Sequence, residues 1–262
     1  MIRALYTAAS GMSAQQTNLD TIANNLANSA TTGFHQRQVQ FEDMIYQNLI
    51  TPGSAQTQQT LSAGLQVGLG TKSAASEVIM TQGDFNQTNG QLDMAIQGAG
   101  FFQISRPDGT IAYTRAGNFH PNSQGTLVTS NGDTVLPAIS IPSNATNITI
   151  SPYGVVSATI PGQSNASQLG TIQLATFANP GGLSSIGGNL LTQTESSGNP
   201  ITDTPGGSTG MGTLQQGYLE NSNVDVVAEF VQMILAQRAY ESNSKVIHVA
   251  DDMYSQINGL IR

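Results

Sequence analysis

The stretch NSNVDVVAEFVQMILAQRAYESNSKVIHVADDMYSQINGLIR, residues 221–262, decides how this chain folds. Its apolar residues recur every three or four positions, which is the period of an α-helix. One row follows the whole stretch, and a second lies on an adjacent face of its first half. The rows are Val227, Val231, Leu235, Ala239, Val246, Ala250, Met253, Ile257 and Leu260, and Val226, Phe230, Met233 and Tyr240. A helix that is apolar on more than one side needs several neighbours to cover it.

The start of this helix is marked by polar residues. Ser222 is placed to act as the N-cap, and Asp225 follows three residues later in the capping-box position. A carboxylate at this position also interacts favourably with the positive end of the helix dipole. A continuous helix over the stretch would be roughly 60 Å long, at about 1.5 Å per residue.

The other end of the chain carries a matching pattern over residues 1–28. Its apolar row advances in steps of three and four, as in a coiled-coil seam: Ile2, Leu5, Ala9, Met12, Gln16, Leu19, Ala23 and Leu26. Small residues beside that row, Ala4, Ala8, Gly11 and Ala14, permit close contact with another helix. A polar run ending at Gly33 predicts where the helix stops. We expect the two terminal helices to pair as a coiled coil and then to pack against copies of themselves.

Between the helices, residues 71–180 change to short runs bounded by turn residues, which is typical of β-structure. Arg106-Pro107-Asp108-Gly109 predicts a hairpin turn. Further strands are expected at Leu92–Ile96, Phe101–Ile104, Thr110–Thr114, Thr126–Thr129, Asn147–Ile150, Val155–Ile160 and Thr171–Phe177. This spacing favours an all-β domain of barrel or sandwich type.

The predicted fold class is therefore α+β. Residues 1–33 and 221–262 form the terminal helical domain, and 71–180 form an inserted β-rich outer domain. Residues 34–70 and 181–220 are rich in Gly, Ser, Thr, Gln and Pro over much of their length and are expected to be extended connectors. For residues 34–50 the pattern fits either a short helix or an extended arm.

The composition excludes several classes of protein. Only 9% of residues are charged, the net charge is −8, and the eight Lys and Arg are scattered, so no basic surface for nucleic acid is expected. No run approaches the ~20 apolar residues of a membrane span, and polar residues 10–20 interrupt any signal-peptide core. The absence of cysteine removes disulfides and thiolate metal sites.

No motif in the chain commits it to catalysis or to a cofactor. His35, His120 and His248 lack the spacing of metal ligands, and Asp251-Asp252 fits a solvated helix face. In residues 68–73, Thr71 separates Gly70 from Lys72, which breaks a phosphate-loop pattern. We therefore expect no enzyme activity, catalytic residue, metal or cofactor, although carboxylates can meet in the fold without a sequence signal.

Three separated motifs carry a resemblance to a known family. NLDTIANNLANSATTGF (18–34) is similar to the N-terminal signature of bacterial flagellar rod and hook axial proteins, and GYLENSNVDVVAEFVQMILAQRAYESNSKVI (217–247) resembles their C-terminal signature. TQGDFNQTNGQLDMAIQGAGFFQI (81–104) and YTRAGNFHPNSQGTLVTSNGDTVLP (113–137) resemble their shared β-core. The likeness covers nearly the whole chain. One departure is His35, where the family usually carries Lys.

The resemblance implies a structural role in the flagellar basal body. The length and residues 46–70 look most like a subunit of the distal rod, a rigid drive shaft, and a proximal rod subunit is the alternative. The implied partners are copies of the chain, proximal rod proteins, the hook protein, a rod cap protein, peptidoglycan, outer-membrane ring proteins and the flagellar export apparatus. The implied location spans the periplasm to the outer membrane, after export without a cleavable signal peptide.

Two sets of residues are expected to carry this role. The self-assembly interface is predicted at Leu5, Met12, Leu19, Asn24, Asn25, Leu26, Val227, Phe230, Val231, Ile234, Met253 and Ile257. In the first connector, Pro52, Gly53, Leu61 and Leu65 are predicted to wedge between subunits and keep the polymer straight. Asn24, Asn25 and Asn28 are expected to bond backbone or amide groups at the end of the first helix.

Two other classes remain open from sequence. An enzyme acting on the cell wall could use the helices as a mount, and would release soluble fragments from peptidoglycan. A secreted adhesin with a β domain is the second, but it has no need of paired terminal heptads.

Overall fold

The computed structural model describes residues 2–50, 55–56, 59–60, 64–162, 166–207 and 209–260. Contacts within the chain divide it into two compact units. The helical unit comprises Met1–Ala27, Arg37–Val78 and Asp225–Arg262, and the β unit comprises Asn28–Gln36 and Ile79–Val224. The fold is thus α+β, with a helix at each end of the chain and a β-rich middle, as the sequence predicted.

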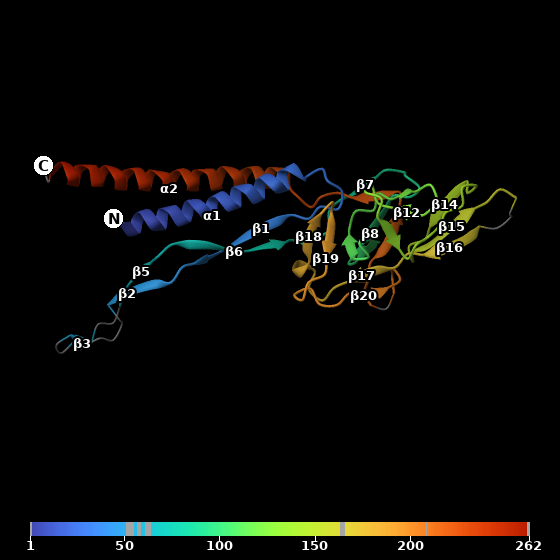
Figure 1. Cartoon of the computed structure of the whole chain (residues 1–262), viewed down its shortest axis with the longest axis horizontal. Coiled ribbons are helices and arrows are strands. Elements are labelled where there is room, and N and C mark those ends of the chain that lie inside the picture. Colours follow the sequence, from blue (N-terminus) through green and yellow to red (C-terminus); the bar gives the residue numbers. More distant parts are fainter. Residues whose placement is uncertain are drawn as a thin grey trace. The chain divides into compact units, whose positions relative to one another are not determined.

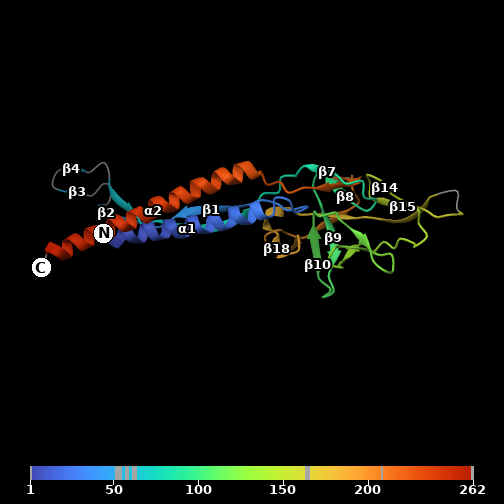
Figure 2. The same ribbon diagram turned by 90° about the horizontal axis from the view of Figure 1, so that it is seen from above.

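Two helices dominate the helical unit: α1 (Ile2–Ala27) and α2 (Val226–Leu260). They lie side by side and run antiparallel, so that both chain ends are at the same end of the pair (Figures 1 and 2). α1 ends close to its predicted stop. A turn follows it, in which the Thr31 N–H donates to the Asn28 carbonyl at 3.0 Å and Gly33 adopts a φ of 67°.

The N-cap of α2 lies three residues later than predicted. Asp225 Oδ1 accepts the N–H groups of Val227 at 2.9 Å and Ala228 at 3.2 Å, and the helix begins at Val226. Ser222, the predicted cap, accepts only the N–H of Val224. The aspartate takes the role because a carboxylate both accepts the free N–H groups and complements the helix dipole.

The rest of the helical unit is a set of antiparallel strand pairs. β1 (Arg37–Asp43) pairs with β6 (Thr71–Val78), β2 (Tyr46–Ile50) with β5 (Leu65–Gly68), and β3 (Ala55–Gln56) with β4 (Gln59–Thr60). Residues 37–50 are therefore extended, which decides between the short helix and the extended arm. We call β2 and β5 together the arm.

Side chains of α1 attach the β1–β6 pair to the helix. Asn25 Nδ2 donates to the Arg37 carbonyl at 2.8 Å, and Asn25 Oδ1 accepts the Arg37 N–H at 2.9 Å. Fifteen residues earlier on α1, Ser10 Oγ accepts the N–H of Thr71 at 3.4 Å. The expectation that Asn25 bonds backbone at the end of the helix is confirmed.

The largest sheet of the β unit runs in the order β11-β12-β13-β9-β10-β19-β18, with β17 pairing β9 and β20. This order has two ends, so of the two expected forms, barrel or sandwich, the sheet is not a closed barrel. Its strands are β9 (Phe101–Ser105), β10 (Ile111–Thr114), β11 (His120–Pro121), β12 (Leu127–Val128), β13 (Thr134–Leu136), β17 (Leu174–Thr176), β18 (Ser184–Gly187), β19 (Leu190–Thr192) and β20 (Ile201–Asp203).

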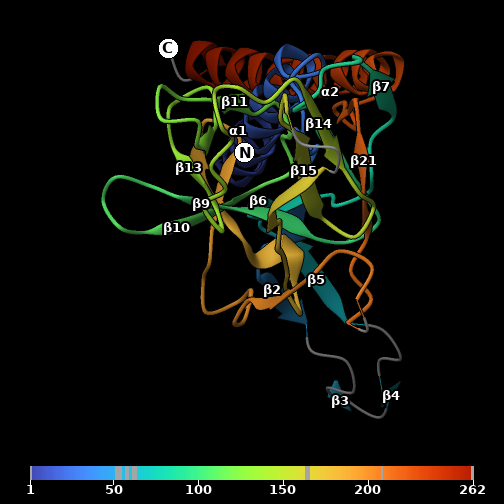
Figure 3. The same cartoon turned by 90° about the vertical axis from the view of Figure 1, so that its right-hand side faces the viewer.

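Smaller sheets complete the β unit. One is β14 (Asn147–Ile150), β15 (Val155–Thr159) and β16 (Ser167–Thr171); the others pair β8 (Met94–Gln97) with β21 (Thr213–Gln216) and β7 (Phe85–Gln87) with β22 (Tyr218–Glu220). The β9–β10 hairpin, predicted from its Pro-Asp-Gly turn, projects from its sheet (Figure 3). Phe102 and Phe119 meet edge to face in the core, with ring centroids 5.1 Å apart.

The predicted domain limits differ from the two units in the structure. Thr71–Val78 is β6 of the helical unit, and Asn28–Gln36 belongs to the β unit. Residues 181–220 carry strands β18–β22 instead of forming a connector. Their single apolar residues, such as Leu183, Leu190 and Leu214, are buried between glycine-rich turns, and a composition average conceals such isolated core residues.

Candidate functional site

Small side chains allow α1 and α2 to approach closely. Gly11 of α1 packs so near Asn243 of α2 that a Cβ on Gly11 would lie 2.8 Å from Asn243 Nδ2. Ala8 on α1 and Ala236 and Ala250 on α2 are buried. At Gly11 the close approach predicted for the small residues of α1 is therefore present.

The covered positions of α2 include some members of both predicted rows and some positions outside them. The buried or half-buried residues are Glu229, Met233, Ala236, Ala239, Asn243, Ser244, Ile247, Ala250 and Tyr254, and all of them except Ala239 and Ser244 follow heptad steps. Tyr240, 37% exposed, occupies the remaining position of that pattern. Two helix axes come closest where side chains are small, and the buried Ala236 and Ala250 provide such positions on α2.

The larger aliphatic residues of α2 are exposed in two patches. The 226–235 patch consists of Val226, Val227, Phe230, Val231, Ile234 and Leu235, and the 246–257 patch of Val246, Val249, Met253 and Ile257. Val227 is 71% exposed and Leu235 is 57% exposed. All predicted interface residues of α2 belong to these patches. Contiguous exposed apolar surface of this kind marks an interaction site.

The predicted interface residues of α1 divide into three groups. Leu5, Met12, Leu19 and Leu26 are half-buried, and Asn24 is exposed. Asn25 is only 1% exposed and bonds the backbone of Arg37 through both of its polar atoms. Its inclusion in a surface that faces other subunits is therefore corrected, because its side chain is used within the unit.

A small apolar groove lies between the two helices near the chain ends. It has a volume of about 250 Å³ and is lined by Ala4 of α1 and by Val246, Val249, Ala250 and Met253 of α2, with Lys245 beside them. The groove extends the 246–257 patch onto α1.

The arm adds further exposed apolar residues. Tyr46, Leu49 and Ile50 of β2 and Leu65 of β5 are 42–51% exposed, and the neighbouring Ile45 is 83% exposed. Leu65 is thus the one predicted connector residue whose position is known. Pro52, Gly53 and Leu61 lie outside the described residues.

Within the β unit, a buried cluster of ionisable groups joins segments far apart in sequence. Arg115 Nη1 lies 3.4 Å from Glu220 Oε2, and His35 Nε2 lies 4.0 Å from Glu220 Oε1. The Arg115 guanidinium also donates to the carbonyls of Ile96 at 3.3 Å and Gly98 at 2.7 Å. We call His35, Arg115 and Glu220 the buried triad.

Burial controls the protonation of the triad. Loss of solvent, together with the nearby Arg115 cation, lowers the pKa of His35 to about 4, so its imidazole is neutral at pH 7. Burial raises the pKa of Glu220, while Arg115 and the N–H of Gly83 oppose that rise. Sequence reasoning missed the triad, because its members are 80 and 105 residues apart along the chain and none carries a motif.

The other chemistry-bearing residues are dispersed. His120 and His248 are exposed, and residues 68–73 lie at the β5–β6 turn, with no helix to complete a phosphate site. Among the residues that the structure describes, no three His, Cys, Asp or Glu side chains are grouped to hold a metal ion. Neither described helix is long and apolar enough to cross a membrane.

Comparison with known protein families gives three matches along the chain. Residues 5–35 match the family model "Flagella basal body rod protein", and residues 215–260 match "Flagellar basal body rod FlgEFG protein C-terminal". Residues 95–158 match "Flagellar hook protein FlgE/F/G D1 domain". The first two matches cover most of α1 and α2.

Individual proteins are similar over the full length. The "Flagellar basal-body rod protein FlgG" of Borreliella burgdorferi is 51% identical, with 100% of both chains covered. The proteins of that name in Buchnera aphidicola subsp. Acyrthosiphon pisum, 46% identical over 99% of this chain, and Bacillus subtilis, 40% identical over 100%, cover all of the relative. A solved structure, the Helicobacter pylori flagellar hook protein FlgE2, matches 71% of this chain and 43% of its own at 15% identity, with a TM-score of 0.25.

Proposed function

Because the chain belongs to the flagellar basal-body rod protein family, we propose that it builds the rod by packing the exposed patches of α2 against further copies of itself. The chain is a structural component of the rod, like its relatives of 40–51% identity. It is not an enzyme. The cell-wall enzyme and the adhesin are therefore set aside.

One observation carries the proposal. The ten aliphatic and aromatic residues of the two α2 patches are 39–71% exposed. Full burial of one such side chain is worth about 1.5–3 kcal/mol, so burying even half of that surface across ten residues is a large driving force. A repeated contact between different faces of identical subunits, which does not close, produces a helical filament.

The pairing of α1 with α2 is proposed to be a coiled coil. The heptad steps of the covered row on α2 and the close approach at Gly11 support it. In the polymer, the inner layer consists of these helix pairs. The proposed contacts between subunits are the 226–235 and 246–257 patches, together with Leu5, Met12, Leu19, Asn24 and Leu26 of α1.

A matched pair of double variants tests the assembly proposal. In Val231→Ser/Ile234→Ser, two side chains that are each 51% exposed lose their apolar surface, and we expect polymer formation to require at least tenfold more protein. The control, Gln232→Ser/Gln237→Ser, alters exposed polar residues of the same helix segment and is expected to polymerise as the parent does. Sedimentation velocity and electron microscopy give the readout. Equal assembly of both double variants would refute the proposal.

The arm is proposed to lie between neighbouring subunits and to keep the polymer straight. The exposed apolar residues of β2 and β5 support this, since a two-stranded ribbon with such a surface is marginal by itself. Pro52, Gly53, Leu61 and Leu65 are the connector residues proposed for this role. Deletion of residues 46–68 should yield a curved or flexible polymer, and a straight, stiff polymer from the deletion variant would refute the role.

The position and neighbours of the rod follow as proposals. Length and the connector favour the distal over the proximal rod. The proposed partners are the proximal rod proteins, the hook protein, a rod cap protein, peptidoglycan, the outer-membrane ring proteins and the flagellar export apparatus. The proposed location runs from the periplasm to the outer membrane, with export that requires no cleavable signal peptide. Crosslinking in intact basal bodies tests each neighbour separately.

A further inference from the structure

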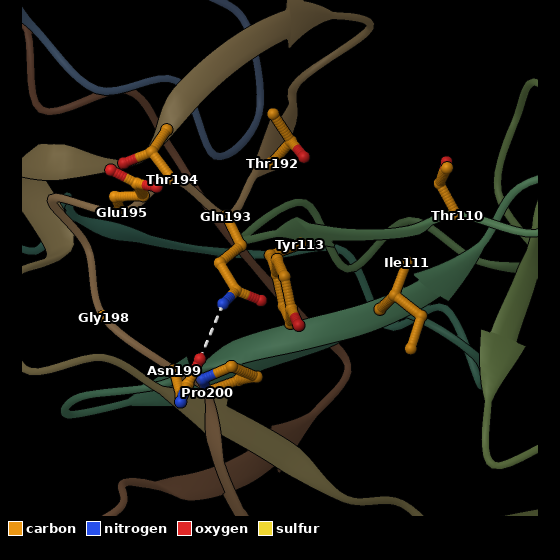
Figure 4. A pocket seen from close by; sticks show the side chains of 10 residues that line it. All are labelled: Thr110, Ile111, Tyr113, Thr192, Gln193, Thr194, Glu195, Gly198, Asn199 and Pro200. Atoms are coloured by element: carbon orange, nitrogen blue, oxygen red, sulfur yellow. Dashed lines mark hydrogen bonds between the residues drawn. The ribbon is translucent and has the colours of Figure 1, made fainter.

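The β unit carries an open pocket that the assembly role does not use. It has a volume of about 830 Å³ and is formed by β10, β19 and the segment that leads to β20. Pockets that bind small ligands commonly have 300–1,000 Å³. Figure 4 shows the lining side chains turned toward a common space.

The floor of this pocket presents a tyrosine hydroxyl. Tyr113 of β10 is 2% exposed as a residue, and its ring packs edge to face on Phe177 with centroids 4.8 Å apart. Its hydroxyl end points into the open pocket (Figure 4). None of the residues that the structure describes bonds this hydroxyl, and it is not among the buried polar atoms left without a partner. The hydroxyl is therefore open to the pocket and available to bond a ligand.

The wall of the pocket presents paired hydrogen-bonding groups. Gln193 Nε2 donates to Asn199 Oδ1 at 3.1 Å, which leaves one amide oxygen and one amide nitrogen for a ligand. The segment is fixed by Ser197, which is fully buried; its Oγ donates to the Thr194 carbonyl at 2.8 Å and accepts the Thr194 N–H at 3.0 Å. The pocket is therefore preorganised, which lowers the entropic cost of binding.

The chemistry of the lining selects the ligand. No Lys, Arg or His is among the ten lining residues, and Glu195 is the one charged group, so an anion is disfavoured. Thr192, Tyr113 and two amides supply donors and acceptors, and Ile111 and Pro200 supply apolar surface. The hydroxyls of Thr110 and Thr194 already donate to Asp108 and to the Gly182 carbonyl. Hydroxyl groups that both donate and accept, on a ring with C–H faces, match this set.

A peptide strand fits the pocket less well. β10 lies between β9 and β19, and β19 lies between β10 and β18, so neither offers an unpaired edge for strand addition. We propose that this pocket binds a neutral saccharide, with Tyr113 and the Gln193–Asn199 pair as the recognising groups.

The full-length protein can be titrated with two neutral trisaccharides, triacetylchitotriose and maltotriose, by NMR or calorimetry. We expect millimolar or tighter binding of at least one of them. Tyr113→Phe removes only the hydroxyl and should weaken binding roughly threefold to tenfold, the effect of one hydrogen bond. Tyr153→Phe is the matched control, since Tyr153 is 63% exposed and lies outside the pocket. Its affinity should equal that of the parent.

Stability separates a binding role of the hydroxyl from a structural one. Tyr113→Phe should melt at the temperature of the parent protein, because none of the described residues bonds the hydroxyl that it removes. A clearly lower melting temperature would show that the hydroxyl is bonded within the fold and would overturn the proposal. Absence of binding by both trisaccharides, equal affinity in Tyr113→Phe, or binding of inorganic phosphate at the pocket would overturn it as well.

Discussion

At the scale of single residues, the buried triad makes the stability of the β unit depend on pH. His35 has a pKa of about 4 in the folded protein and about 6.5 when unfolded. Between these values the unfolded chain binds a proton that the folded chain does not, so the free energy of unfolding falls as pH is lowered from 6.5 to 4. The loss is on the order of 3 kcal/mol, at about 1.4 kcal/mol per pKa unit. Urea unfolding at pH 7 and pH 5 should show about 2 kcal/mol of this loss, because pH 5 lies about 1.5 units below 6.5.

The variant His35→Gln isolates this effect from that of Glu220. The raised pKa of Glu220 means that the folded state holds its proton more firmly, which adds stability as pH falls. Glutamine can still donate to the Gly33 carbonyl, which His35 Nδ1 approaches to 3.2 Å, but it does not titrate. We expect the fall in stability from pH 7 to pH 5 to be smaller in His35→Gln. An equal fall in both proteins would contradict the prediction.

A second prediction concerns the charge pair itself. Arg115→Met leaves the Glu220 carboxylate, which is fully buried, without its cation. Removing one partner of a buried pair typically costs about 3–5 kcal/mol. We expect a loss of that order in urea unfolding at pH 7. The double variant Arg115→Met/Glu220→Gln should recover part of it, because no buried charge is then left alone. If the double variant is no more stable than Arg115→Met, the loss does not come from the unpaired Glu220 charge.

At the scale of elements, α2 depends on a cap that the sequence placed three residues too early. Asp225→Ala removes the acceptor of two N–H groups, and such losses cost about 1 kcal/mol. Ser222→Ala, at the predicted cap, should cost clearly less. Thermal unfolding followed by circular dichroism at 222 nm compares the two variants. Equal losses of stability in the two variants would indicate that Ser222 caps the helix, as the sequence predicted.

The elements show what apolar periodicity can and cannot predict. Both helices, the stop before Gly33 and the β9–β10 hairpin follow from spacing and turn residues. The face of α2 that contacts α1 follows only in part. Apolar periodicity includes Met233 and Ala250 but not the buried Ala236, because it ranks hydrophobicity, whereas close helix contact also depends on small side chains. The strands in residues 181–220 were missed because glycine-rich turns dilute the few apolar residues between them.

At the scale of the whole molecule, the exposed patches of α2 imply that folding of the terminal helices is coupled to assembly. Two helices that leave this much apolar surface exposed are weakly stabilised by themselves. We expect the monomer to show much less helical circular dichroism than the polymer at the same protein concentration per residue. Burial of the patches then supplies the free energy that orders α1 and α2. A monomer with the full helical signal would contradict this coupling.

The part of the candidate assembly surface that lies within one helix could be predicted from the sequence. Val227, Phe230, Val231, Ile234, Met253 and Ile257 stand out within one helix, and all are exposed. Asn25 was misassigned because its partner, the backbone of Arg37, belongs to a strand that the pattern left undecided. The buried triad and the pocket around Tyr113 arise from residues that only the fold brings together, so no local pattern signals them.

The triad also sets an order of events during synthesis on the ribosome. Glu220 lies 187 residues after Gly33 in the sequence; its backbone carbonyl accepts the Gly33 N–H at 2.8 Å, and its carboxylate faces Arg115 and His35. A nascent chain that ends before Glu220 has no carboxylate for Arg115, and β7 lacks its partner β22. The contacts that close the β unit therefore require synthesis to have passed Glu220.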